Sequence, residues 1–128
     1  MVIGEGRALD RVYILERDSK MVYMYDVLKK TLNKRGVNIP NKFEHNFQYV
    51  QTESNRLFLI GGGDITKNAA SLKQCFEIID TGDQVLDCIA RDELKFGRHG
   101  HSICVLKDKF LVVTGSRVDQ EEAFNKCE

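Results

Sequence analysis

The chain of 128 residues has no tryptophan, a single proline and no excess of charge of either sign. Lysine plus arginine and aspartate plus glutamate both number 19, so the basic surplus that neutralises nucleic-acid phosphates is missing. No apolar run approaches the roughly 20 residues that cross a bilayer. The first ten residues have neither the basic flank nor the apolar stretch of a secretory signal. These absences argue against nucleic-acid and membrane partners and predict a cytoplasmic domain.

Four cysteines are present, and no two of them form a C-x-x-C pair. Without such pairs a common zinc site is not expected and four free thiols are predicted, of which Cys88 and Cys104 lie in apolar stretches and are expected to be buried. His99, His101 and Cys104 form a string of metal-ligand residue types. On a strand, however, His101 and Cys104 point to opposite faces, so the three side chains do not converge. We therefore predict no metal and no other cofactor.

Short apolar runs recur along the chain, and turn-forming residues separate them. Their length of four to six residues and their content of Val, Ile, Leu, Phe and Tyr are typical of strands. The pattern predicts an all-β fold, either a sandwich, a barrel or a propeller. Leu57–Ile60 and Phe110–Val113 are apolar at every position, which predicts strands buried on both faces. The runs are Val12–Leu15, Met21–Tyr25, Phe47–Val50, Leu57–Ile60, Cys75–Ile79, Val85–Ala90, Ile103–Leu106 and Phe110–Val113.

Three blocks of sequence recur in the same order about fifty residues apart. The matched pairs, at offsets of 53, 54 and 56 residues, are Leu57–Gly63 with Phe110–Ser116, Val22–Asp26 with Phe76–Asp80, and His45–Tyr49 with His101–Val105. One such match could arise by chance, but three in register indicate an internal repeat.

A period near fifty, with a glycine doublet after an apolar strand, resembles the kelch motif. The R-x-G-H-S pattern of that family is matched by Arg98–Ser102, its doublet by Gly61-Gly62 and its third-strand Tyr-Asp by Tyr25-Asp26. The family's tryptophan, six residues after that aspartate, is replaced by leucine in both repeats. The residues that match structural positions of the motif are Tyr25, Asp26, Leu32, His45, Gly61, Gly62, Asp80, Leu86, Arg98, His101 and Gly115.

The resemblance implies a partial kelch-type β-propeller of about two and a half four-stranded antiparallel blades. Residues 1–10 would be an N-terminal segment, and residues 11–40 would supply strands b to d of a partial blade. Residues 41–92 would form a complete blade, and residues 93–128 would begin a further, truncated one. Propellers typically close with 4–8 blades, so we expect a fragment of a longer ring or self-association that completes one.

The resemblance also implies a non-catalytic scaffold that binds a protein partner through inter-strand loops on one face. The predicted contact residues are Asp64, Thr66, Lys67, Asn68, Arg117 and Asp119. Two alternatives stay open, namely the remnant of a propeller enzyme domain and a repeat fragment with no independent function. Catalysis is not expected, because Ser102 and His101 are adjacent strand residues that point to opposite faces.

Overall fold

The computed structural model describes residues 10–16, 19–40, 47–63, 72–116 and 127–128, and these form strands joined by turns and irregular segments. The strands are β1 (Arg11–Leu15), β2 (Met21–Asp26), β3 (Thr31–Val37), β4 (Gln48–Gln51), β5 (Leu57–Ile60), β6 (Cys75–Ile79), β7 (Val85–Arg91), β8 (Ser102–Leu106) and β9 (Phe110–Thr114). Each apolar run of the sequence therefore contributes a strand, within a residue or two at its ends. The all-β prediction is confirmed.

The first three strands form an antiparallel meander in which alternate residues point to opposite faces. Tyr13, Val22 and Met24 are buried on the inner face, with exposures of 8% or less. The turn between β2 and β3 is stabilised by Asp26, whose Oδ1 accepts a hydrogen bond of 2.8 Å from the Lys29 backbone N–H.

The next four strands, β4 to β7, are also antiparallel neighbours. All four residues of β5 are buried, because this strand has a hydrogen-bonded neighbour on each side and covered residues on each face. The prediction that Leu57–Ile60 is buried on both faces is therefore confirmed. Leu57, Leu59, Ile78 and Leu86 complete the core with the inner residues of β1 and β2.

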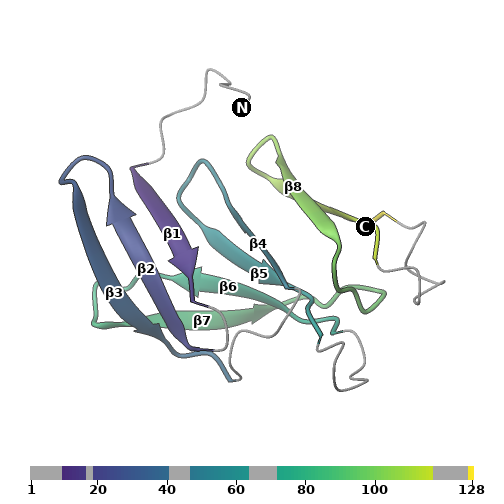
Figure 1. Ribbon diagram of the computed structural model, residues 1–128. Coiled ribbons are helices and arrows are strands. Elements are labelled where there is room, and N and C mark those ends of the chain that lie inside the picture. The colour runs from purple at the N-terminus through teal and green to yellow at the C-terminus, as the bar shows by residue number, and fades with distance from the viewer. Residues whose placement is uncertain (1–9, 17–18, 41–46, 64–71, 117–126) are drawn as a thin grey trace.

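A short parallel pairing joins the two groups of strands. Gly36 and Val37 of β3 pair with Val85 and Leu86 of β7, so the strands form one mixed seven-stranded sheet in the order β1-β2-β3-β7-β6-β5-β4. The sheet curves over the shared core into a nearly closed barrel (Figure 1). Its two outer strands are linked where the Gln51 side chain on β4 donates a hydrogen bond to the Arg11 carbonyl on β1.

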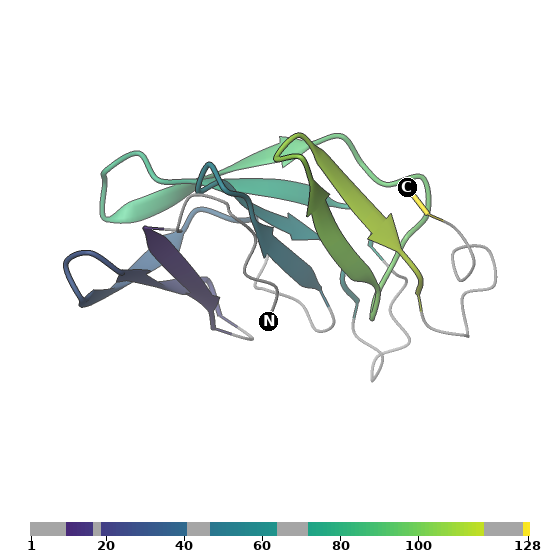
Figure 2. The same ribbon diagram turned by 90° about the horizontal axis from the view of Figure 1, so that it is seen from above.

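The remaining two strands form a separate hairpin. β8 pairs with β9 outside the seven-stranded sheet, and β8 lies next to β4. Figure 2 shows this hairpin at the opposite end of the molecule from β1, β2 and β3. The chain end adds to the hairpin, since Val113 and Glu128 exchange backbone hydrogen bonds of 2.8 and 2.9 Å.

The predicted partial propeller of two and a half four-stranded blades is wrong. The parallel β3–β7 pairing merges seven strands into a single mixed sheet, where separate blades would be purely antiparallel. The physical reason is local, because Val37 and Leu86 are both buried in the shared core and the Asn38 N–H extends the pairing by donating to the Leu86 carbonyl. The prediction that Phe110–Val113 is buried on both faces is also wrong, since Phe110 is 53% exposed.

Candidate functional site

An apolar surface lies on the outer side of β1, β2 and β3. The strand register places Val12 opposite Tyr25 and Tyr25 opposite Leu32, so these three side chains form one row across the sheet. Ile14 and Tyr23 form the neighbouring row. We call these five residues the first outer face. Val12, Ile14, Tyr25 and Leu32 are 41%, 51%, 37% and 58% exposed.

This surface is unusual because two of its strands, β1 and β2, carry apolar side chains on both sides. An antiparallel sheet with one side in water normally alternates apolar and polar residues. Here the inner residues Tyr13 and Met24 are buried in the core, while their strand neighbours Val12 and Tyr25 are apolar and exposed. Contiguous exposed apolar surface of this kind marks an interaction site in soluble proteins.

A basic side chain borders the first outer face. The Lys34 ammonium lies 5.1 Å from the centre of the Tyr23 ring and 3.4 Å from the Glu16 carboxylate. Its interaction with Tyr23, followed by that with Glu16, raises the pKa of Lys34 above its ordinary value. The border of the apolar face therefore carries a positive charge held next to an aromatic ring.

A second apolar surface lies on the β8–β9 hairpin. Cys104 is paired with Val112 and Leu106 with Phe110, and these four residues share the side of the hairpin that we call the second outer face. Leu106 and Phe110 are 51% and 53% exposed.

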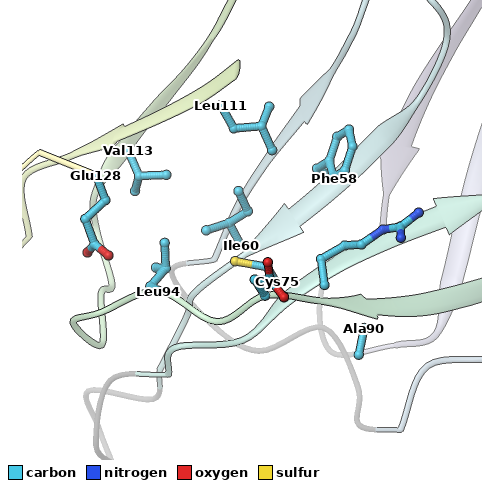
Figure 3. Close-up of a pocket in the computed structure, with 10 residues that line it drawn as sticks. Phe58, Ile60, Cys75, Ala90, Leu94, Leu111, Val113 and Glu128 are labelled. Carbon is cyan, nitrogen blue, oxygen red and sulfur yellow. The ribbon is translucent and has the colours of Figure 1, made fainter. Parts of the chain in front are cut away.

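A cavity of about 390 Å³ separates the β8–β9 hairpin from the main sheet. Phe58 and Ile60 of β5 line one side, and Leu111 and Val113 of β9 line the other (Figure 3). Cys75 also lines it, and burial raises the pKa of its thiol to about 11. The thiolate is the reactive form of cysteine, so this side chain is a poor nucleophile at neutral pH.

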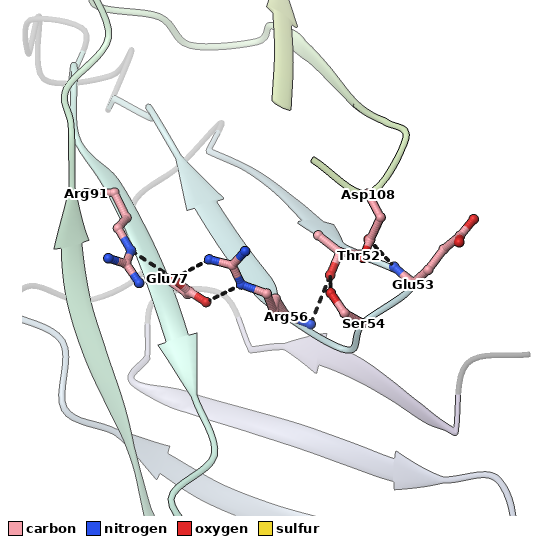
Figure 4. A network of polar contacts seen from close by, with 7 residues as sticks. All are labelled: Thr52, Glu53, Ser54, Arg56, Glu77, Arg91 and Asp108. Carbon is pink, nitrogen blue, oxygen red and sulfur yellow. Dashed lines mark hydrogen bonds and ion pairs between the residues drawn. The ribbon is translucent and has the colours of Figure 1, made fainter. Parts of the chain in front are cut away.

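A buried carboxylate near this cavity is fully engaged by two arginines. Glu77 on β6 is 4% exposed and accepts hydrogen bonds of 2.6 and 2.9 Å from Arg56 (Figure 4). Arg91 on β7 donates to the same carboxylate through two nitrogens. The hydrogen bonds from Arg56, and then those from Arg91, hold the pKa of Glu77 below its ordinary value. The cluster links the β4–β5 turn, β6 and β7, and its carboxylate stays ionised rather than acting as a general acid.

A second carboxylate bridges the two halves of the main sheet. Asp80, directly after β6, lies 2.7 Å from the Arg35 guanidinium on β3 and 3.1 Å from that of Arg11 on β1. Burial acts against ionisation, but the hydrogen bonds from Arg35 and from the Gly82 N–H keep the pKa of Asp80 below its ordinary value. The predicted motif residue Asp80 is therefore a structural link.

Arg98 and His101, which match structural positions of the motif, lie against the glycine doublet Gly61-Gly62. Arg98 is completely buried and donates to Glu128 and to the Gly115 carbonyl at 2.9 and 2.7 Å. His101 is 3% exposed, and burial, followed by the nearby charge of Arg98, lowers its pKa to about 4. A Cβ atom added to Gly61 would lie 2.5 Å from the Arg98 carbonyl oxygen. These residues fix the packing of the glycine segment against the start of the hairpin.

The two leucines that occupy equivalent motif positions have different surroundings. Leu86 is completely buried, whereas Leu32 is 58% exposed and belongs to the first outer face. Tyr25 lies on the same face, and Asp26 stabilises the β2–β3 turn.

The predicted partner contacts lie outside the described residues. This applies to Asp64, Thr66, Lys67, Asn68, Arg117 and Asp119, and also to the motif residue His45. Within the described residues, His99 and His101 are buried while Cys104 is exposed. No group of three or more His, Cys, Asp or Glu side chains in that part of the chain could hold a metal ion.

The comparisons with known proteins do not identify the chain. No protein-family model matches it, and no curated protein matches it. The kelch resemblance therefore stays a prediction. In the described ranges, no helix has the length and apolarity needed to cross a membrane.

Sequence reasoning missed the first outer face. Val12–Leu15 is apolar at every position, as Leu57–Ile60 is, and that pattern predicts burial on both sides. The structure buries Tyr13 and exposes Val12 and Ile14 instead. The signal that could have found this face was the same unbroken apolar run in the first strand, where the described chain supplies no second layer.

Proposed function

We propose that the chain is a non-catalytic protein-binding module and that the first outer face is its docking surface. The observation that carries the proposal is the row Val12–Tyr25–Leu32, three apolar side chains that are adjacent across three strands and 37–58% exposed. Monomeric soluble proteins rarely expose contiguous apolar surface of this kind without a binding role. Tyrosines at the centre of the face add to the argument, because Tyr is enriched in protein interfaces.

The ionisable groups of the described residues support binding rather than catalysis. The buried carboxylate of Glu77 and the partly buried carboxylates of Asp80 and Glu128 are each held by arginine and kept ionised. The thiols of Cys75 and Cys88 have pKa values raised to about 11. A general acid needs a pKa near the working pH and a nucleophilic thiol needs a lowered one, and these groups have neither.

The proposed surface differs from the loops that the sequence favoured. Those loop residues lie outside the described part of the chain, so the proposal depends on the rigid face of a sheet. A sheet face suits recognition, because its side chains are already held in register before a partner arrives and less ordering is needed on binding.

A photo-cross-linking experiment tests this proposal. The photoreactive residue p-benzoylphenylalanine is placed at Leu32, and in a matched control at Leu28 in the β2–β3 turn, which is 77% exposed and outside the face. Each protein is irradiated in an extract of its source cells. We expect a protein adduct from position 32 that position 28 does not give and that Tyr25→Asp removes. Equal labelling from both positions, or no adduct at all, would contradict the proposal.

A further inference from the structure

We propose that the partner of the first outer face is the second outer face of another copy of this chain, so that copies associate head to tail. This inference rests on the proposed function, because it names the occupant of the same docking surface. The argument comes from how equivalent strands already pack within one chain.

The two β-hairpins have the same internal register. Gln48 pairs with Ile60 and Gln51 pairs with Leu57 in the first hairpin, β4–β5. Ser102 pairs with Thr114 and Val105 pairs with Leu111 in the second, β8–β9. The turn hydrogen bonds match as well, from the Asn55 N–H to the Thr52 carbonyl and from the Lys109 N–H to the Leu106 carbonyl, so every partner in the second hairpin lies 54 positions after its counterpart. This structural offset corrects by one the 53 residues that match Leu57–Gly63 with Phe110–Ser116 in the sequence. The hairpins are structural equivalents, and residues can be compared one by one.

Each hairpin packs the same side toward the strands that precede it. Leu57 and Leu59 of the first hairpin are in the core with the inner residues of β1 and β2. Their counterparts, Leu111 and Val113, face β5 across the cavity (Figure 3). On the other side of the first hairpin, Phe58 and Ile60 are covered by the second hairpin, and both are 7% exposed or less.

The second hairpin has no such cover among the described residues. Val112 and Thr114 are the counterparts of Phe58 and Ile60. They lie on the same side of the hairpin as Cys104, Leu106 and Phe110, which are exposed. The apolar strand surface that covers this side of the first hairpin is formed by Leu111 and Val113. By equivalence, the missing cover of the second outer face should be a surface of the same kind.

The first outer face is such a surface. The side of β1 that carries Tyr13 faces the first hairpin in the shared core, so Val12 and Ile14 lie on the opposite side. On β5, Leu57 and Leu59 likewise lie opposite Phe58 and Ile60, the side that faces the next hairpin. Val12 and Ile14 thus lie on the side of their strand that corresponds to the side of the two leucines on β5, but no described strand precedes β1.

The two outer faces are therefore opposite halves of one repeated contact. They lie at opposite ends of the molecule, so one chain cannot bring them together (Figure 2). A second copy can supply the missing half at either end. Such a heterologous contact produces rings or open chains of copies rather than a symmetric dimer.

Sedimentation velocity with one variant for each face tests the inference. Leu32→Asp alters the first outer face and Phe110→Asp alters the second, both at side chains more than half exposed, so folding should be preserved. Leu28→Asp is the matched control outside both faces. All samples contain a thiol reductant, because Cys104 and Cys127 are exposed.

We expect the unaltered chain and Leu28→Asp to show an average mass that rises with concentration above the monomer's 14.6 kDa. Each face variant alone should associate about tenfold or more weakly, because a buried charge replaces a central apolar contact. A mixture of the two variants keeps one intact face of each kind. It should therefore form a one-to-one dimer and nothing larger.

Three results would overturn the inference. They are a monomeric unaltered chain, a single variant that associates as strongly as the unaltered chain, and a mixture that stays monomeric. The proposed function is judged separately by cross-linking from position 32 in the purified protein. An adduct between copies supports both proposals, and an adduct that forms only in cell extract supports docking while rejecting self-association. No adduct in either sample rejects both.

Discussion

Val37 of β3 and Leu86 of β7 are parallel partners, and both are almost completely buried. Together with Gly36 and Val85 they form the only strand pairing between the two groups of strands in the main sheet, within the described residues. The backbone of Leu86 therefore helps to join the two groups of strands, and its side chain packs in the core that they share.

Replacement of Leu86 should therefore be far more damaging than replacement of Leu32, its counterpart in the sequence repeat. Leu86→Ala leaves a cavity in the core and should lower the free energy of unfolding by about 2–5 kcal/mol. Leu32→Ala removes an exposed side chain and should change it by less than about 0.5 kcal/mol. Urea unfolding followed by circular dichroism measures both. Similar losses for the two variants would show that the core assignment of Leu86 is wrong.

The same pair of leucines shows what the sequence could and could not predict. Apolar runs bounded by turn residues were enough to place the strands, because strand formation depends on local pattern. The β3–β7 contact involves only two residues on each strand, and Gly36 and Val37 carry no local sign of a parallel neighbour. Burial also differs between repeats, since it depends on whether another layer covers each strand.

The candidate site was less predictable than the strands for the same reason. Val12 and Ile14 have the composition of buried strand residues, and only the arrangement of layers shows that they are exposed. The sequence directed attention to inter-strand loops because rigid scaffolds usually bind through them. The unbroken apolar run of β1 marks both of its sides as apolar, but a single sequence does not show which side another layer covers.

Gly61 should tolerate no side chain, whereas Gly115 should tolerate one at a moderate loss. Both have positive φ, 65° and 76°, which costs an ordinary residue about 1–2 kcal/mol. At Gly61 a Cβ would also lie 2.5 Å from the Arg98 carbonyl oxygen, while at Gly115 no atom of the described residues would lie within 4 Å. We expect Gly61→Ala to lower the free energy of unfolding by at least about 2 kcal/mol more than Gly115→Ala does. Equal losses in thermal unfolding would mean that the backbone contact relaxes freely.

Glu77 should make stability depend on pH in the acid range. Its pKa is lowered from the ordinary value of 4.5, so the folded state keeps the carboxylate ionised at pH values where the unfolded chain binds a proton. The stabilisation is fully present above pH 4.5 and is lost as the pH falls through the lower folded value. Glu77→Gln should lower the free energy of unfolding by about 1–3 kcal/mol at pH 7 and flatten this acid dependence.

The matched control for that substitution is Glu53→Gln in the exposed β4–β5 turn. It changes the charge by the same amount without removing a partner from Arg56 and Arg91. Urea unfolding from pH 3 to pH 7 measures both variants. An unchanged acid slope in Glu77→Gln would assign the dependence to other groups.

The cysteines should differ in reactivity, and one of them reports on self-association. Thiols with a pKa of about 11, as at Cys75 and Cys88, hold about a hundredfold less thiolate at pH 8 than a thiol of pKa 9.0. Cys104 and Cys127 are exposed, so iodoacetamide should label them first, as timed peptide mass spectrometry can measure. Cys104 lies on the second outer face. Raising the protein concentration should therefore slow its labelling relative to Cys127, and the Leu32→Asp variant should remove that slowing. If Cys104 is labelled at the same rate at every concentration, copies do not meet through this face.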